Sequence, residues 1–385
     1  MNSRSPDGIR QPIPATLQGR WEDYVFAIEG YGETPEDLWN AAANATPGRR
    51  SMFLLGVGFD PRAVYGLQKF LALSHPIPPV IGLIELPPFS ALTGRSVRNS
   101  ANNNRQTFAD SINGFEVRTI QYQEVHSALN SGPRISRLLN KRSLVEGVGH
   151  LIIDVSSLPS SIYFPVIAAA LKSVDAEIPD FPSQVQIAAC ENPGVDAAIV
   201  ELEISEANFV GGFRGAFAHD SQPQTTIAWA PIVGENSGPA MRAVHGFLRP
   251  NDVFPVFPFP SRDPRRADTL LLEHQTELLY EFRVELGNII HANEQNPFDL
   301  YKSLAQLKLD LDSAFGNLGP TALATSTHSS KLLSIGVLLA AYEHELPVVT
   351  APPIEYELIE SAIGQCVDEH RLACAWLTGE PYAWG

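Results

Sequence analysis

The segment SMFLLGVGFDPRAVYGLQKFLAL, residues 51–73, decides the fold that the sequence predicts. Ser51 to Val57 is a continuous apolar run, which is typical of a strand buried on both faces of a parallel sheet. The run ends at Gly58-Phe59-Asp60-Pro61, and Ala63 to Leu73 then has the apolar spacing of a helix. A buried strand, a glycine turn and a helix in this order indicate one unit of a doubly wound α/β sheet.

The same alternation of strand and helix continues along the chain. Further strands are expected at 79–86, 115–122, 150–155 and 183–189 and, after a Gly-rich polar passage at 210–224, at 225–233, 253–259, 288–292, 321–325 and 346–351. A helix with Thr34 as its N-cap is expected to begin near 34–36, and a strongly apolar helix is expected at 332–342. The polar, Asn-rich residues 91–110 are expected to form a loop or an exposed helix. The predicted fold class is therefore α/β, with two Rossmann-like lobes whose sheets are mainly parallel. The expected organisation is a flexible leader over 1–16, an N-terminal domain over 17–209 and a C-terminal domain over 225–385.

Composition excludes several classes of partner. The 385 residues carry a net charge of −16, which disfavours a surface that binds nucleic acid or anionic lipid. Only three cysteines occur, without a CxxC pair, so a disulfide framework and a cysteine-rich zinc site are not expected. No apolar stretch approaches the roughly 20 residues that span a membrane, and residues 1–16 lack a signal-peptide pattern, which together predict a cytoplasmic location.

The first candidate ligand loop is Gly56-Val57-Gly58, between the expected strand and the following helix. Glycines at this position let the backbone approach a ligand, and Glu85, at the end of the next strand, is placed to bind a ribose hydroxyl. The combination suits a dinucleotide or S-adenosylmethionine. However, the third glycine of the dinucleotide pattern is absent, and Glu85 lies further along than the usual spacing of about 20 residues. A tight turn that needs glycine for steric reasons remains the alternative.

A second candidate follows the expected strand at 150–155. Asp154 stands at the carboxyl end of that strand, where open α/β sheets bind their ligands, and is a candidate base or ribose contact. Ser156 and Ser157 are candidates for binding a phosphate. A serine that caps the next helix explains the same residues without a ligand.

Four turns of the C-terminal half place polar groups after expected strands. They contain Glu235, Asn236 and Ser237; Arg262, Asp263 and Arg265; Asn293, Glu294 and Asn296; and His328, Ser329, Ser330 and Lys331. Since parallel strands end at one edge, these turns are expected to face a common crevice. Arg262, Arg265 and Lys331, with Ser329 and Ser330 as neutral donors, predict a phosphate or carboxylate site. Glu235 or Asp263 is the candidate base, and ion pairs that close the crevice are the alternative.

Several motifs are absent from the sequence. It contains no GxxxxGK[ST] loop, no GxSxG elbow and no HExxH pair, which removes support for a P-loop NTPase, an elbow serine hydrolase and a zinc site of that type. Cys190 is expected to be a buried structural cysteine. Trp376, Tyr382 and Trp384 are expected to form a packed tail or a subunit contact.

The turns GVGFDPR (56–62) and DVSSLPS (154–160), with SSKLLSIG (329–336), resemble those of Rossmann-like proteins encoded in bacterial anti-phage defence operons. This resemblance implies an accessory or effector role beside other operon products. It assigns no catalytic residue to the chain.

Three functions are compatible with these features. The preferred hypothesis is a protein that binds a phosphate-bearing, nucleotide-class ligand, with catalysis left open and no particular cofactor indicated. The second is an S-adenosylmethionine-dependent methyltransferase that uses Gly56, Gly58, Glu85 and Asp154. The third is a non-catalytic scaffold subunit that binds other protein subunits.

Overall fold

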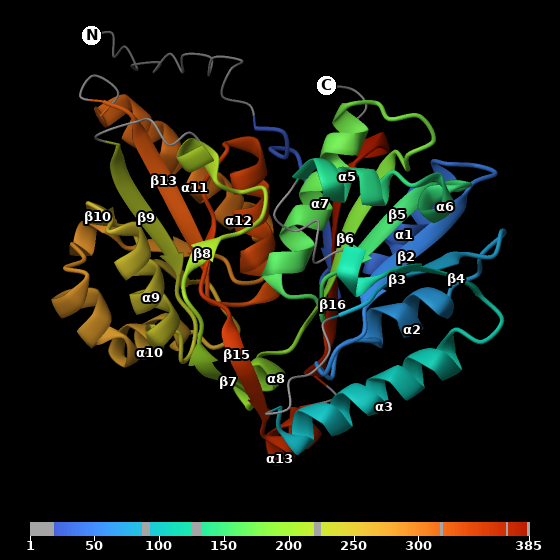
Figure 1. Cartoon of the computed structure of the whole chain (residues 1–385), viewed down its shortest axis with the longest axis horizontal. Coiled ribbons are helices and arrows are strands. Elements are labelled where there is room, and N and C mark those ends of the chain that lie inside the picture. The colour runs from blue at the N-terminus through green and yellow to red at the C-terminus, as the bar shows by residue number, and fades with distance from the viewer. Residues whose placement is uncertain are drawn as a thin grey trace, which may run out of the picture.

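The computed structural model describes residues 19–86, 93–124, 132–218, 225–315, 319–366 and 369–382. These residues form a mixed α/β structure in which two sheets lie side by side with helices packed against them (Figure 1). The α/β class predicted from the alternating pattern is confirmed. No helix in the described ranges is long and apolar enough to cross a membrane.

The larger sheet contains seven strands. In spatial order they are β1 (Val25–Ile28), β16 (Arg371–Thr378), β6 (Gln184–Glu191), β5 (Val148–Asp154), β2 (Arg50–Gly56), β3 (Val80–Ile84) and β4 (Glu116–Ile120). Strand β16 is antiparallel to both of its neighbours, whereas β2 to β6 are mutually parallel. When these five strands are numbered along the chain, their spatial order is 3-2-1-4-5. The order therefore reverses between β2 and β5, which is a topological switch point.

Helices cover both faces of this sheet. They are α1 (Pro35–Asn44), α2 (Tyr65–Leu71), α3 (Arg95–Ser111), α5 (Gly132–Leu139), α6 (Arg142–Val145), α7 (Ser160–Asp175) and α8 (Pro193–Ala198). The expected start of α1 is confirmed, because the Thr34 side chain accepts from the Asp37 amide and the Asp37 carboxylate accepts from the Thr34 amide. Residues 91–110, expected to be a loop or an exposed helix, contain most of the long helix α3.

The smaller sheet is parallel throughout. Its strands are β9 (Thr226–Ile232), β10 (Asp252–Val253), β11 (Val256–Pro258), β12 (Ile290–Ala292) and β13 (Thr321–Thr327). Its helices are α9 (Gly238–Leu248), α10 (Arg266–Glu273), α11 (Pro297–Phe315) and α12 (Lys331–Glu343), and a π-helical turn spans Thr276–Glu281. β10 and β11 pair with β9 on one side, and β13 pairs with it on the other. When β10 and β11 are counted as one strand and the strands are numbered along the chain, their spatial order is 3-2-1-4. The switch point lies between β9 and β13.

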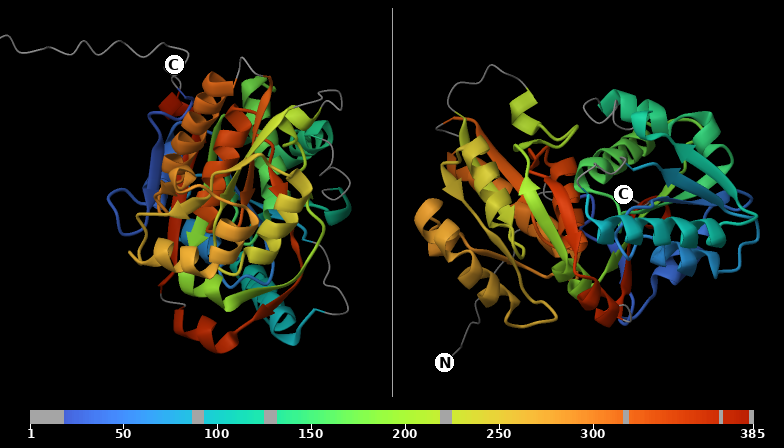
Figure 2. Two further views of the ribbon diagram at one scale, coloured as in Figure 1. Left: turned by 90° about the vertical axis from the view of Figure 1, so that its left-hand side faces the viewer. Right: turned by 60° about the horizontal axis from the view of Figure 1, so that its bottom comes forward.

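Two short antiparallel ribbons connect the sheets. β7 (Ile199–Ile204) pairs with β15 (Pro353–Leu358), and β8 (Asn208–Phe209) pairs with β14 (Val349–Thr350). The chain leaves the larger sheet through β7 and returns through β15 and α13 (Glu360–Cys366), as the two views of Figure 2 allow the reader to follow.

The return of the chain differs from the sequence expectation. β16 was expected to lie with the C-terminal domain over 225–385, but it is an inner strand of the larger sheet, paired with β1 and β6. Its eight residues, RLACAWLT, are almost all buried, so burial between these two strands explains the pairing. The division of the chain into two independently folding domains stays a prediction.

Helix α12 is central to the packing of the two sheets. Ten consecutive residues, Leu332 to Ala341, are buried, and one apolar cluster contains side chains of α7, α11, α12 and both sheets. Two further clusters lie on the outer faces, one under α1 and α2 and one under α9 and α10. The sheets therefore share the helical layer between them. This shared layer fixes how their edges face each other.

The packing of α12 against α11 predicts opposite effects at two glycines. A Cβ at Gly336 would lie 2.5 Å from the Pro297 carbonyl oxygen and 3.0 Å from Leu300 Cβ, whereas a Cβ at Gly246 in α9 would have no neighbour within 4 Å. We expect Gly336→Ala to lower the free energy of unfolding by about 1–3 kcal/mol through overpacking. Gly246→Ala should raise it by roughly 0.5–1 kcal/mol, since alanine favours helix. Urea unfolding measures both; equal stabilisation by the two variants would contradict this packing.

Candidate functional site

A cavity of about 490 Å³ lies between the two sheets, and we call it the inter-sheet cavity. Its walls come from the turns after β2 (Val57–Asp60, Arg62), β5 (Ser156–Pro159), β9 (Glu235, Asn236) and β13 (His328–Lys331), together with residues of α3, α8, α10 and the β7–β15 ribbon. The first two turns flank the switch point of the larger sheet, and the last two flank that of the smaller sheet. Both positions at which open α/β sheets bind ligands therefore face a single cavity.

The glycine loop after β2 is packed against the turn after β5. The Gly58 amide donates to Ser157 Oγ over 2.9 Å, and a Cβ at Gly58 would lie 2.7 Å from that oxygen. A Cβ at Gly56 would collide with Leu158. Both glycines are therefore required because the protein's own loops approach each other closely. This agrees with the alternative of a tight turn that needs glycine for steric reasons. Gly58 also lines the cavity, so it forms part of the wall.

Helix α3 holds the same loop from the other side. Asn104 is 8% exposed, and its Nδ2 donates to the carbonyl oxygens of Gly58 and Asp60 at 2.9 and 2.7 Å. Ser100 Oγ donates to the Phe59 carbonyl oxygen at 2.6 Å. The sequence analysis missed both residues because they lie in an Asn-rich stretch without apolar character. The available signal was the spacing of Val97, Ala101, Asn104 and Phe108, which forms one buried helical face.

Arg62 is a buried cation behind the loop. It is 2% exposed, and its Nε and Nη2 donate to the Asp60 carboxylate over 2.9 and 2.8 Å, while Nη1 lies 2.8 Å from Asp196 Oδ1. Burial alone would raise the pKa of Asp60, but the adjacent guanidinium outweighs it and leaves this pKa below its usual value. Arg62 therefore holds Asp60 as a carboxylate and also pairs with Asp196, although the sequence analysis did not single out this arginine.

On the opposite wall, Lys331 and Ser329 present donors that are only partly used. Lys331 Nζ donates to the Leu158 carbonyl oxygen at 2.7 Å and forms no ion pair with a residue of the described ranges. Ser329 Oγ is buried, and no described residue is its hydrogen-bond partner. Burial lowers the pKa of Lys331, an effect that Asp60 opposes. The predicted donors Ser329, Ser330 and Lys331 thus all reach the cavity, with Ser330 Oγ also capping α12 by accepting from the Leu333 amide.

The two other predicted cations of the anion site lie elsewhere. Arg262 and Arg265 are exposed and do not line the inter-sheet cavity, and Asp263, a candidate base, is exposed and accepts from the Arg265 amide within its own turn. Arg266 takes the inward position instead, because it is the first residue of α10 and its side chain turns toward the sheet edge.

Arg266 is already paired inside the cavity. It lies 2.8 Å from Glu235 and 3.1 Å from Glu294, so the candidate base Glu235 is engaged in an ion pair. The ion pairs of Arg266 therefore close the turn that contains Glu235, which is the alternative to an anion site that the sequence also allowed.

The two acids predicted in the N-terminal half do not line the cavity. Glu85 Oε2 accepts from the Tyr122 amide over 3.2 Å and so ties the end of β3 to the end of β4. Asp154 is 1% exposed, and its Oδ1 accepts from the Ser156 amide and hydroxyl. Burial raises the pKa of Asp154 to about 6. Within the described ranges, no three His, Cys, Asp or Glu side chains are arranged to hold a metal ion.

Glu191 connects the larger sheet to the start of α12. It stands at the end of β6, is 6% exposed, and accepts from the Leu332 amide over 3.0 Å. Burial raises the pKa of Glu191 to about 7, and the nearby Asp196 carboxylate acts in the same direction. This carboxyl group thus occupies the amino end of α12, a position that favours negative charge.

An aromatic pair forms another part of the wall. The rings of Phe59 and Tyr356 lie 4.8 Å apart, and they come from the glycine loop and from β15 of the connecting ribbon. Glu201 of β7 is opposite Tyr356 in the ribbon register. The cavity therefore combines an apolar, aromatic side with the donors of Lys331 and Ser329.

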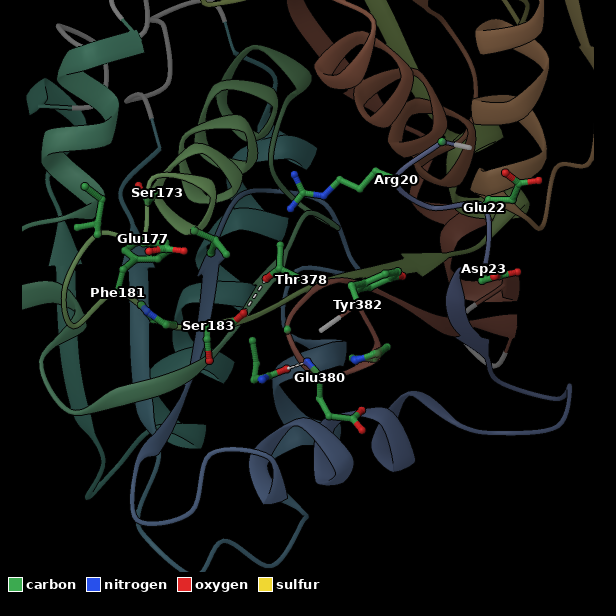
Figure 3. Close-up of a pocket in the computed structure, with 17 residues that line it drawn as sticks. Arg20, Glu22, Asp23, Ser173, Glu177, Phe181, Ser183, Thr378, Glu380 and Tyr382 are labelled. Carbon is green, nitrogen blue, oxygen red and sulfur yellow. Dashed lines mark hydrogen bonds between the residues drawn. The ribbon is translucent and has the colours of Figure 1, made fainter. Parts of the chain in front are cut away.

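A second cavity, of about 1240 Å³, lies at the amino edge of the larger sheet. Figure 3 shows its acidic side chains, Glu22, Asp23, Glu177 and Glu380, around a single cation, Arg20, which pairs with Asp175. Thr378 Oγ1 donates to the Ser183 carbonyl oxygen across its floor. Its carboxylates are exposed, and it lies at the edge opposite the strand ends that open α/β sheets use for ligands. The inter-sheet cavity is therefore the candidate site.

Comparison with known proteins adds no family. No protein-family model matches the chain, and no curated protein matches it. Among solved structures, the cytoplasmic domain of a prokaryotic cation chloride cotransporter has a TM-score of 0.21 and 10% identity, covering 82% of this chain and 99% of that chain. Similarity at this level supports no functional argument.

Glu191 predicts a specific dependence of stability on pH. Because its pKa is raised to about 7 in the folded state, the neutral form is favoured there, and stability is lost as pH rises from about 4.5 to 7. The loss amounts to about 3 kcal/mol at most. Glu191→Gln keeps an acceptor for the Leu332 amide but has no charge. We therefore expect its unfolding free energy, relative to wild type, to increase between pH 5 and pH 8 in urea titrations. Parallel pH profiles would show that Glu191 stays charged.

Proposed function

We propose that the chain consists of two Rossmann-like lobes that bind one phosphate-bearing, nucleotide-class small molecule in the inter-sheet cavity. The observation that carries the proposal is the position of the two switch points. The turns after β2 and β5 and those after β9 and β13 line the same cavity. A ligand there would touch the preferred binding edge of both sheets at once.

The chemistry of the walls supports an anionic group on the ligand. Among the described residues, Lys331 has no paired carboxylate and its ammonium group has donors to spare, and Ser329 Oγ is buried without a hydrogen-bond partner. A buried polar group without a partner costs about 1–3 kcal/mol, which a ligand oxygen would recover. On a chain of net charge −16, a cavity lysine without a direct ion pair in the described ranges is a local exception.

The aromatic wall supports a ligand that also carries a flat ring. Phe59 and Tyr356 are in contact at one side of the cavity, and a purine or pyrimidine base would pack against such rings. A volume of about 490 Å³ lies within the range of sites that hold small molecules. The proposal is one of binding; a reaction is not part of it, since Glu235 is engaged with Arg266 and Asp263 is outside.

The test is a ligand screen combined with a matched pair of variants. AMP, ADP, ATP, NAD and S-adenosylmethionine are added to the protein, and the melting temperature is measured, because a ligand that binds only the folded state stabilises it by about 2.7 kcal/mol at 100 times its Kd. For the nucleotide that binds, we expect Lys331→Met to weaken affinity by roughly 10- to 150-fold in calorimetry. Arg265→Met removes the same charge outside the cavity and should leave affinity unchanged.

Three outcomes would contradict the proposal. Stabilisation by S-adenosylmethionine alone would favour the methyltransferase hypothesis. No stabilisation by any compound would favour the scaffold hypothesis, in which protein subunits are the partners. Equal affinity of Lys331→Met and wild type would place the ligand outside the inter-sheet cavity.

A further inference from the structure

The loop Gly58-Phe59-Asp60 has all three of its carbonyl groups directed at one helix. Asn104 donates to the Gly58 and Asp60 carbonyl oxygens, and Ser100 donates to that of Phe59. In a planar trans peptide the N–H points opposite to the C=O of the same unit. The amide N–H groups of Phe59 and Asp60 therefore both point away from α3.

These two amides have no acceptor among the residues that the structure describes. No residue of the described ranges accepts a hydrogen bond from the N–H of Phe59 or of Asp60, although the amides on either side, those of Gly58 and Arg62, bond to Ser157 and to the Asp60 side chain. Phe59 and Asp60 both line the inter-sheet cavity. Adjacent backbone N–H groups that point the same way form a concave site for an anion.

Two cations, Arg62 and Lys331, offset the acids around the loop. Arg62 is shared between the carboxylates of Asp60 and Asp196. Lys331 is close enough to Asp60 to lower its pKa further, so the ammonium group and the loop share one region of the cavity. Ser329, whose Oγ has no partner among the described residues, lies on the same wall as Lys331.

We infer that the Phe59 and Asp60 amides bind the phosphate group of the ligand, between the loop and Lys331, and that Asn104 is the positioning residue that orients them. This inference rests on the proposed function and names the atoms that would recognise the phosphate. Asn104 does not touch the ligand; it acts by holding the two carbonyl groups that flank the amides. Ser100 assists by holding the third.

The experiment observes the amide directly. The protein is labelled with [¹⁵N]phenylalanine, and the Phe59 resonance is assigned as the one that is lost in Phe59→Leu. We expect addition of AMP, and of inorganic phosphate, to shift the Phe59 amide proton downfield as it gains a charged acceptor. The amides of Phe298 and Phe315 in α11, which do not line the inter-sheet cavity, provide the internal reference. Loop packing without a ligand contact would not produce this shift.

Variants of α3 provide the second arm. Asn104→Ala should weaken AMP binding about 10-fold and reduce the Phe59 shift. Ser100→Ala removes one bond only and keeps the test valid if Asn104→Ala does not fold. The matched control is Asn103→Ala, which changes the neighbouring exposed asparagine of the same helix and should bind as wild type does.

The outcomes separate the two proposals. If AMP binds and Lys331→Met weakens it, but the Phe59 amide does not shift at saturation, the inference is wrong and the proposed function stands. If none of the screened nucleotides binds and inorganic phosphate does not bind either, both are wrong. A Phe59 shift that is lost in Asn104→Ala and kept in Asn103→Ala supports the inference.

Discussion

The structure depends on how the amino end of α12 is joined to the larger sheet. Two adjacent residues make this connection: the Leu332 amide donates to Glu191, and Lys331 Nζ donates to the Leu158 carbonyl oxygen. Burial of a carboxyl group is costly, and the raised pKa of Glu191 reflects that cost. The hydrophobic surface of α12, buried from Leu332 to Ala341, offsets it. α12 follows β13 after a short turn. These two hydrogen bonds therefore also orient the carboxyl ends of the smaller sheet's strands toward the larger sheet.

The inter-sheet cavity is a consequence of that arrangement. Each sheet reverses its strand order at one place, and the shared helical layer brings the two places together. The loops then supply different chemistry. One sheet contributes closely packed glycines and the backbone amides of the loop, and the other contributes the Lys331 ammonium group and the Ser329 hydroxyl group, which has no partner among the described residues. The β7–β15 ribbon closes the side between them with Tyr356 and Glu201. Neither sheet alone would form this combination.

Local patterns predicted much of the fold, because they depend on nearby residues. The buried run at 51–57, the Thr34 cap and the apolar run of α12 each specify their element without tertiary information. The position of β16 could not be read from the sequence, since an apolar run does not name its pairing partner. The positions of polar side chains were harder still to predict from the sequence. Arg265 and Arg266 are adjacent and alike, yet only the helix geometry of α10 turns the second into the cavity, and the buried role of Asn104 depends on carbonyl groups more than 40 residues away.

The measurement that tests the central claim most directly is hydrogen–deuterium exchange of the whole protein with and without the nucleotide that stabilises it. A ligand held between the two switch points should slow exchange in two segments at once, 57–62 after β2 and 328–334 after β13, since it contacts both walls. Segments around the amino-edge cavity, 173–184 and 378–382, should exchange as before. Protection confined to that second cavity, or to one wall alone, would contradict the account.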